Sequence, residues 1–191
     1  VGGLSIVGTT GIVIPYSCSA WIDSIRRGVD VARALGYRHV GAATGSTSEQ
    51  TVMRLHGLPE DAMLDMGDFA GAVLTYLRRH PIPRLTLGGG IAKFVKLGFG
   101  HLDLHSKRSQ VDLPALADVA AQEGAPASLV EEIRTANTAL DALQRSQAAG
   151  FDLGGLVARR ARAAALDVLR GAPVEVDVVV IDRAGTIVGR A

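Results

Sequence analysis

The stretch RHVGAATGSTSEQTVMRLH, residues 38–56, decides the fold class. Its first six residues, 38–43, form a mainly apolar run of the length that is typical of a buried strand. Small polar residues at 44–48 interrupt that run, and a helix is expected over 49–56. A strand, a glycine-bearing loop and a helix in this order predict one unit of a β-α-β fold.

Similar units lie on both sides of this stretch. Strands are expected at 4–7, 62–65 and 84–87, and helices at 20–35, 69–79 and 91–99. Strands that alternate with helices predict a parallel sheet, because a parallel connection needs a crossover element. Near the end of the chain, a long apolar strand at 174–181 is followed by a turn at 182–185 and a short return strand at 186–189, which predicts an antiparallel hairpin.

The sequence therefore predicts an α/β protein with a mostly parallel sheet flanked by helices in a three-layer, Rossmann-like arrangement. We expect residues 1–191 to form a single domain. In it, 1–112 supply the β-α-β core with its ligand loops, 113–170 a helical segment, and 171–191 the terminal hairpin that completes the sheet. Glycine and proline at 124–126 and glycine at 150 divide the helical segment into three helices, the last over 161–169. The chain opens without methionine on a strand-like run, which suggests a fragment or a processed product.

Composition narrows the class of function. The chain is 48% hydrophobic and 20% charged with a net charge of +1, which is typical of a globular protein and not of a general binder of nucleic acid. Aromatic residues make up 4%, too few for base-stacking platforms. No apolar run is long enough to span a bilayer, no export signal is present, and the single cysteine, Cys18, can form neither an intrachain disulfide nor a cysteine-only metal site. We expect a cytoplasmic protein with no membrane or nucleic-acid partner.

Cations concentrate in one stretch, GIAKFVKLGFGHLDLHSKRSQVD, residues 90–112. A solvated helix face followed by a loop is the commoner origin of such a charge run. In a nearly neutral chain, however, a local positive surface also indicates a polyanionic ligand. The cationic and imidazole side chains of this stretch are Lys93, Lys96, His101, His105, Lys107 and Arg108.

Three glycine-bearing loops, at 8–11, 44–48 and 88–90, follow predicted strands. Ligands of open α/β sheets bind beyond the carboxyl ends of the strands, so these loops are candidate parts of a pocket, although each alone could be an ordinary turn. The run at 88–90 resembles a phosphate cradle, but the GxxxxGK[ST] and GxGxxG patterns are absent, which argues against a nucleotide kinase or a dinucleotide enzyme. His101 and His105 would share a face only in a continuous helix, which the neighbouring glycines disfavour, so no protein metal site is predicted.

Four segments together resemble a known family. They are GTTGIV at 8–13, followed by Pro15 and Ser17, the TGST loop at 44–47 with Glu49, GDF at 67–69, and IAKFVKLGFGHLDLHS at 91–106. In this order they resemble the cobalt-precorrin-5B C-1 methyltransferase family, the CbiD-type enzymes of cobalamin biosynthesis, over roughly residues 3–112. The chain departs from the usual family residues at four positions: Ser46 and Asp68 stand for asparagine, Gly90 for histidine and Ala92 for glycine.

The resemblance implies S-adenosylmethionine-dependent C-methylation of a cobalt-containing tetrapyrrole, cobalt-precorrin-5B to cobalt-precorrin-6A, in anaerobic-type cobalamin biosynthesis. S-adenosylmethionine would be the co-substrate, and cobalt would arrive as part of the anionic tetrapyrrole substrate. The N-terminal family motif RTGxTTGxCA is absent, so the chain resembles the C-terminal half of a longer two-domain enzyme.

The expected site residues follow from the loops, the cationic stretch and the resemblance together. The proton that leaves the substrate carbon would need a base, for which His105 and Glu49 are the candidates. Glu49 could equally cap the helix that follows it. The methyl donor is expected at Gly8, Thr9, Thr10, Gly11, Thr44, Gly45, Ser46 and Thr47, and the substrate carboxylates at Lys93, Lys96, Ser106, Lys107 and Arg108.

Two other functions stay open from the sequence alone. One is a non-catalytic tetrapyrrole-binding or assembly domain. The other is an α/β enzyme that acts on a phosphorylated metabolite and uses its glycine loops to bind anions. The alanine-rich face of residues 153–169 could pack in the core or across a homodimer.

Overall fold

A five-stranded sheet forms the centre of the fold in the computed structural model, which describes residues 17–191. The order across the sheet is β2-β1-β3-β4-β5. The first four strands are parallel, and β5 pairs antiparallel with β4. The predicted α/β class, with its mostly parallel sheet and terminal hairpin, is confirmed. The strands are β1 (His39–Ala43), β2 (Met63–Leu64), β3 (Arg84–Gly90), β4 (Glu175–Ile181) and β5 (Ile187–Arg190).

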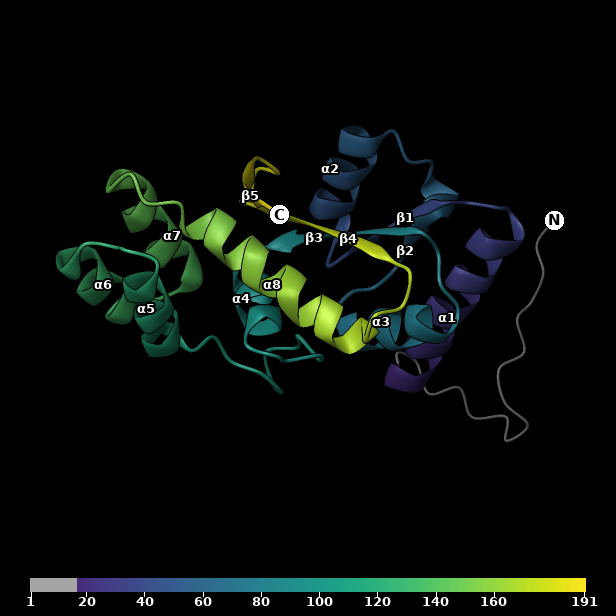
Figure 1. Cartoon of the computed structure of the whole chain (residues 1–191), viewed down its shortest axis with the longest axis horizontal. Coiled ribbons are helices and arrows are strands. Elements are labelled where there is room, and N and C mark those ends of the chain that lie inside the picture. The colour runs from purple at the N-terminus through teal and green to yellow at the C-terminus, as the bar shows by residue number, and fades with distance from the viewer. Residues whose placement is uncertain (1–16) are drawn as a thin grey trace.

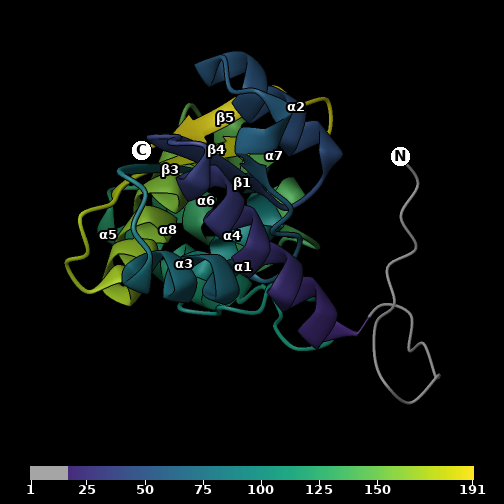
Figure 2. The same ribbon diagram turned by 90° about the vertical axis from the view of Figure 1, so that its right-hand side faces the viewer.

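Helices cover the two faces of this sheet unequally. Of the helices in the described part of the chain, α2 (Ser46–His56) alone lies on one face, as Figures 1 and 2 show from two sides. The main core lies on the other face, where the side chains of Val40, Leu85 and Val176 are fully or almost fully buried. That face carries α1 (Cys18–Ala34), α3 (Ala70–Arg79), α4 (Ile91–Gly98) and α8 (Leu153–Leu169).

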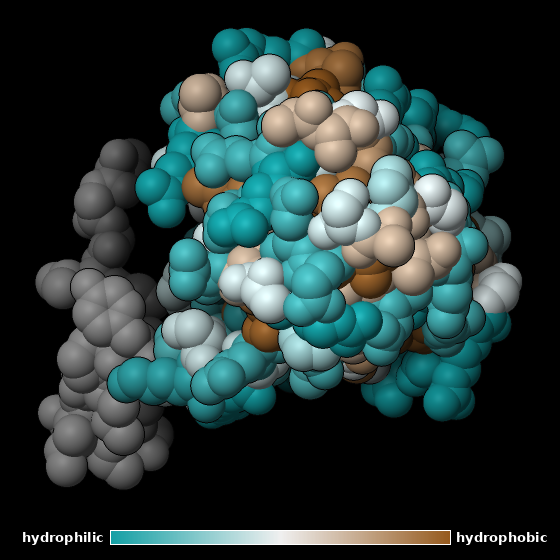
Figure 3. All heavy atoms as spheres, turned by 90° about the vertical axis from the view of Figure 1, so that its left-hand side faces the viewer, coloured by the Kyte–Doolittle hydropathy of each residue, from teal (hydrophilic) through white to brown (hydrophobic). Residues whose placement is uncertain are grey.

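The helical segment contains four helices in place of the three predicted. The additional break falls at 135–138, where the Thr138 side chain caps α7 by accepting a hydrogen bond from the Asp141 amide at 3.1 Å. Helix α8 is also longer than predicted, because the Asp152 carboxylate caps it at the Gly155 amide. Its alanine face is buried against α4 and β4 in the core. The other three helices are α5 (Leu113–Gln122), α6 (Ala127–Arg134) and α7 (Ala139–Ala148), at the end of the molecule where hydrophilic and apolar residues intermingle on the surface in Figure 3.

The glycine run at 88–90 belongs to β3 and is not a loop. Its residues pair with Val179, Val180 and Ile181 of β4. A Cβ atom on Gly88 would lie 2.6 Å from Cγ2 of Val52 in α2, and a Cβ atom on Gly89 would lie 2.7 Å from Oγ1 of Thr44. Glycine is therefore required here because α2 and its preceding loop approach the strand closely, which corrects the interpretation as a phosphate cradle.

Some expectations lie outside the described residues. These are the strand at 4–7 and the loop at 8–11, with Gly8, Thr9, Thr10 and Gly11 as predicted methyl-donor contacts. Among the helices of residues 17–191, none has both the length and the apolar character that crossing a membrane requires.

Candidate functional site

A cleft of about 610 Å³, here called the edge cleft, lies at the carboxyl ends of three parallel strands. Its walls are the segments that directly follow β1 and β4, the start of α4 after β3, and the start of α7. This is the position at which open α/β sheets bind ligands, because the strand ends and the helix starts leave backbone groups and side chains free there. The edge cleft is lined by residues 44–48, 90–93, 138–140 and 181–183.

The TGST loop supplies one wall of the edge cleft. The Thr44 amide donates to the Gly88 carbonyl at 3.0 Å, which ties the loop to β3. The buried Ser48 hydroxyl donates to the Gly45 carbonyl at 2.7 Å and so holds the first turn of α2. Ser46 and Thr47 remain exposed at the cleft. The structure thus brings the predicted residues Thr44, Gly45, Ser46 and Thr47 together in one cavity.

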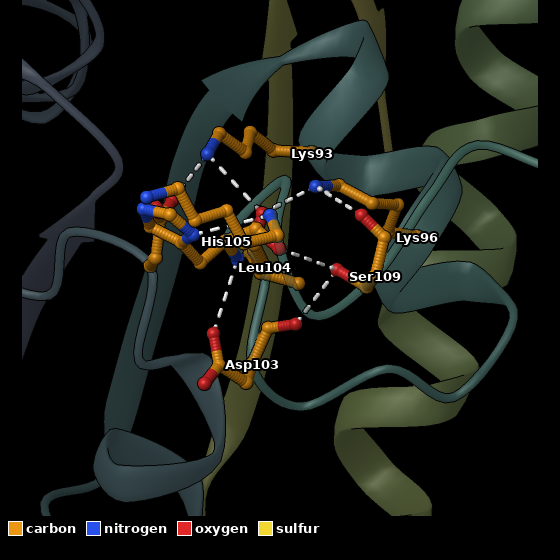
Figure 4. Close-up of polar contacts among 8 residues, drawn as sticks. Lys93, Lys96, Asp103, Leu104, His105 and Ser109 are labelled. Atoms are coloured by element: carbon orange, nitrogen blue, oxygen red, sulfur yellow. Dashed lines mark hydrogen bonds and ion pairs between the residues drawn. The ribbon is translucent and has the colours of Figure 1, made fainter.

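The two predicted clamp lysines lie on α4 and point inward. Lys93 lines the edge cleft, forms an ion pair with Asp68, and donates to the Leu104 carbonyl at 3.2 Å. Lys96 is 4% exposed and donates to the carbonyls of Leu104 and Ser109. Burial, with the nearby Lys93 charge, lowers the pKa of the Lys96 ammonium. Figure 4 shows both ammonium groups converging on the Leu104 carbonyl.

The segment after α4, residues 101–109, is held against the protein by these lysines and by local hydrogen bonds. The Ser109 hydroxyl donates to the Asp103 carbonyl at 2.8 Å, and the Asp103 carboxylate accepts from the His105 amide at 3.0 Å. His105 is exposed, and its Nδ1 accepts from the Lys107 amide at 3.2 Å. The neutral imidazole of His105 therefore carries its proton on Nε2. Ser106 and Lys107 are exposed on the same segment.

A second cleft of about 650 Å³, here called the arginine cleft, lies between α1, α3 and the 101–109 segment. Phe69, Leu102 and Tyr76 contribute to an apolar lining. Three arginines also line it, of which Arg108 pairs with Asp103 at 2.8 Å and Arg26 with Asp23 at 3.0 Å. The 101–109 segment separates the two clefts. On one side, its Leu104 carbonyl accepts a hydrogen bond from Lys93, which lines the edge cleft. On the other side, its residues Leu102 and Asp103 line the arginine cleft. The three arginines are Arg26, Arg79 and Arg108.

Comparison with known proteins finds similarity to one family. Residues 103–191 match the family model described as CbiD, C-terminal domain. Proteins named cobalt-precorrin-5B C(1)-methyltransferase from Brucella canis, Brucella abortus and Brucella melitensis are each 58% identical to the chain over 190 residues. Those matches cover 100% of this chain and 52% of each relative.

The resemblance to the CbiD family is confirmed. The chain spans about half the length of the curated relatives that it matches. No solved structure matches it significantly.

The structure shows where the four residues that depart from the usual family pattern lie. Asp68 is the partner of Lys93, and Ser46 and Ala92 lie at the edge cleft beside Gly90. Glu49 is half-buried on α2, outside the residues that line the edge cleft. The roles predicted for Glu49, for His105 and for the clamp residues therefore stay predictions.

One polar cluster of this chain was not predicted from the sequence. On the face of the sheet under α2, Nε2 of His39 lies 2.8 Å from the Thr86 hydroxyl, and that hydroxyl donates to Asp177 at 3.3 Å. The Arg84 guanidinium also bonds Asp177, at 2.6 Å, and His56 comes from the last residue of α2. The available signal was a polar residue inside each of three apolar strands.

Burial and charge set the protonation of this cluster. Partial burial, together with His56 and Arg84, lowers the pKa of His39 to about 4. Burial and Arg84 also lower the pKa of His56. The Arg84 guanidinium and the Thr86 hydroxyl outweigh burial and lower the pKa of Asp177. At neutral pH both imidazoles are therefore neutral and Asp177 is ionised.

Proposed function

We propose that this chain is part of an S-adenosylmethionine-dependent C-methyltransferase that converts cobalt-precorrin-5B to cobalt-precorrin-6A in anaerobic-type cobalamin biosynthesis. The relatives that match its whole length carry the corresponding name. The observation that supports the proposal most is the edge cleft, which joins the TGST loop, the start of α4 and the β4–β5 turn at the carboxyl edge of the sheet. A cytoplasmic location and a homodimer remain predictions.

The edge cleft is our candidate site for the methyl donor. Its volume of about 610 Å³ lies within the range of small-molecule sites. When bound, S-adenosylmethionine supplies an electrophilic methyl group on a sulfonium. The hydroxyls of Thr44, Ser46 and Thr47 can hydrogen-bond polar groups of that ligand, and Lys93 can meet its carboxylate. The contribution of these residues is to hold donor and acceptor in position, and methyl transfer gains most from such positioning.

The arginine cleft is our candidate site for the substrate. A tetrapyrrole presents an apolar ring and peripheral carboxylates, and the cleft offers an apolar lining with three guanidinium groups. Arginine binds carboxylates with two parallel hydrogen bonds, so Arg26, Arg79 and Arg108 could fix the ring through its side chains. On the exposed part of the 101–109 segment, Ser106 offers a hydroxyl and Lys107 a further positive charge.

His105 and Glu49 remain the candidates for the base. For His105, the free lone pair of the neutral ring is at Nδ1, which is bonded to the Lys107 amide. His105 can therefore accept a substrate proton at Nδ1 only after that hydrogen bond is released. Glu49 would need the substrate to reach past the cleft wall, since it does not line the edge cleft.

The experiment that tests this proposal is calorimetric titration of the chain with two ligands in turn, S-adenosylhomocysteine and a porphyrin that bears carboxylate side chains. Ala92→Trp places a large ring at the edge cleft, and Ala72→Trp places one at the arginine cleft. We expect Ala92→Trp to abolish binding of S-adenosylhomocysteine only, and Ala72→Trp that of the porphyrin only. Loss of neither ligand in either variant would refute the assignment of the clefts.

The same titrations address the two other functions. Binding of the porphyrin without S-adenosylhomocysteine would favour a non-catalytic tetrapyrrole-binding domain. Binding of phosphate or nucleotide alone would favour an enzyme of phosphorylated metabolites, for which the glycine run in β3 now offers no cradle.

A further inference from the structure

Three side chains with metal-ligand chemistry converge on the face of the sheet beneath α2, away from both clefts. His39 begins β1, His56 ends α2, and Asp177 lies near the start of β4. One ligand atom from each lies within 4.8 Å of the other two. The Thr86 hydroxyl sits among them, 2.8 Å from Nε2 of His39 and 3.4 Å from Nε2 of His56, and marks the point on which they converge.

We propose that His39, His56 and Asp177 form a binding site for a divalent transition-metal ion of the zinc type. Two imidazoles and one carboxylate are a common protein ligand set for Zn²⁺, with a fourth position open to water. All three side chains are half-buried, so an ion can reach them from solvent.

The carboxylate is already oriented for such a role. The Arg84 Nε and Nη2 atoms both bond to Oδ2 of Asp177, as does the Thr86 hydroxyl. Within residues 17–191, Oδ1 of Asp177 has no hydrogen-bond partner and is available as a ligand atom. Metal-bound carboxylates are usually held in this way by a second group on their other oxygen. The last turn of α2 also places helix carbonyls near His56, which favours a cation.

Two features oppose binding and limit its strength. The guanidinium groups of Arg84 and Arg190 lie close enough to affect the pKa of His56, so they also repel a cation. In addition, two ligand atoms on one tetrahedral Zn²⁺ ion lie about 3.4 Å apart, as bond lengths of about 2.0–2.1 Å require. The most distant pair of ligand atoms, within 4.8 Å, therefore has to close by up to about 1.5 Å. Rotation of the His56 ring at the end of α2 can supply such a movement.

The position of the site suggests a structural role. It joins α2, the one helix among residues 17–191 on that face of the sheet, to β1 and β4 near the start of these strands. The edge cleft lies at the opposite end of the same strands. A bound ion would thus fix the helix whose first turn carries the TGST loop without contacting a ligand in the cleft.

Titration of the metal-free chain with zinc chloride at neutral pH tests this proposal. We expect binding of one ion per chain, weakened at least about tenfold to a hundredfold in His39→Gln and in His56→Gln. His101→Gln is the matched control, because His101 is exposed and far along the chain from the cluster. This variant should bind zinc with the affinity of the native chain. At free zinc one hundred times Kd, the Tm should rise by about 5–10 °C in the native chain.

A spectroscopic readout separates the site from adventitious surface binding. Cobalt(II) in place of zinc should give visible absorption bands that are lost in His56→Gln. A native circular dichroism spectrum of this variant would show that the loss does not come from unfolding. Absence of one-to-one zinc binding overturns the proposal. Equal affinity of the native chain and His56→Gln, or loss of binding in His101→Gln, overturns it as well.

Discussion

Replacement of Lys96 by methionine should destabilise the protein and loosen the 101–109 segment. Lys96 is 4% exposed, and its ammonium donates to the carbonyls of Leu104 and Ser109. Methionine fills a similar volume but cannot donate a hydrogen bond. The Ser109 carbonyl then loses this donor, whereas the Leu104 carbonyl keeps Lys93 at 3.2 Å.

The size of the effect follows from these contacts. A hydrogen bond to a charged group contributes about 1.5–3 kcal/mol, and two are lost. Two terms offset part of this loss: Lys93 still satisfies Leu104, and the cost of burying an ammonium disappears. We therefore expect Lys96→Met to lower the free energy of unfolding by about 1–2 kcal/mol. Lys93→Met should cost less than about 1 kcal/mol, because the Lys93–Asp68 pair is partly exposed to solvent.

Urea unfolding of the two variants, followed by circular dichroism, measures this difference, and hydrogen exchange reports on the segment. The amides of Leu104 and Ser109 donate to Asp68 and His105 and should exchange faster in Lys96→Met than in the native chain. If Lys96→Met is as stable as the native chain, or less destabilised than Lys93→Met, Lys96 does not anchor the segment. Its role as a direct substrate contact would then be favoured.

Two further predictions concern the sheet beneath α2. Gly88→Ala should lower the free energy of unfolding in urea by about 1–3 kcal/mol, because the new Cβ would lie 2.6 Å from Val52. Gly90→Ala is the control: a Cβ there would have nothing within 4 Å, so the same assay should show a change of less than about 0.5 kcal/mol. Equal effects would argue against close packing of α2. In metal-free buffer, stability should be constant above the unfolded histidine pKa of 6.5 and fall as pH drops toward about 4, since the unfolded chain takes up a proton that native His39 does not. With allowance for solvent screening, the free energy of unfolding should fall by about 1–2 kcal/mol over this pH range. If His39→Gln loses stability in acid as the native chain does, His39 is not the cause of the pH dependence.

The sequence predicted the elements well where local patterns determine them. The strand at 38–43 and the helices at 69–79 and 91–99 agree with β1, α3 and α4 to within a residue at most ends. Each combines an apolar run or periodicity with a clear stop, and both signals are local. The break at 135–138 was missed because its cap, Thr138, stands in a stretch of otherwise helical composition.

What the sequence could not supply are contacts between distant segments. The glycines at 88–90 indicate a loop because glycine is common in loops, whereas the structure explains Gly88 and Gly89 by the close approach of Val52 and Thr44. The spacing of Lys93 and Lys96 predicts surface cations and does not reveal that the ammonium of the buried Lys96 donates to carbonyls of the 101–109 segment. The histidine cluster is assembled from β1, α2 and β4, and only the strand order brings these together.

The most direct test of the central claim is a crystal structure of the chain grown with S-adenosylhomocysteine. Our account predicts the ligand in the edge cleft, in contact with the TGST loop and the start of α4. The ligand in the arginine cleft would contradict it. So would crystals that hold no ligand at a concentration that saturates the native chain in calorimetry.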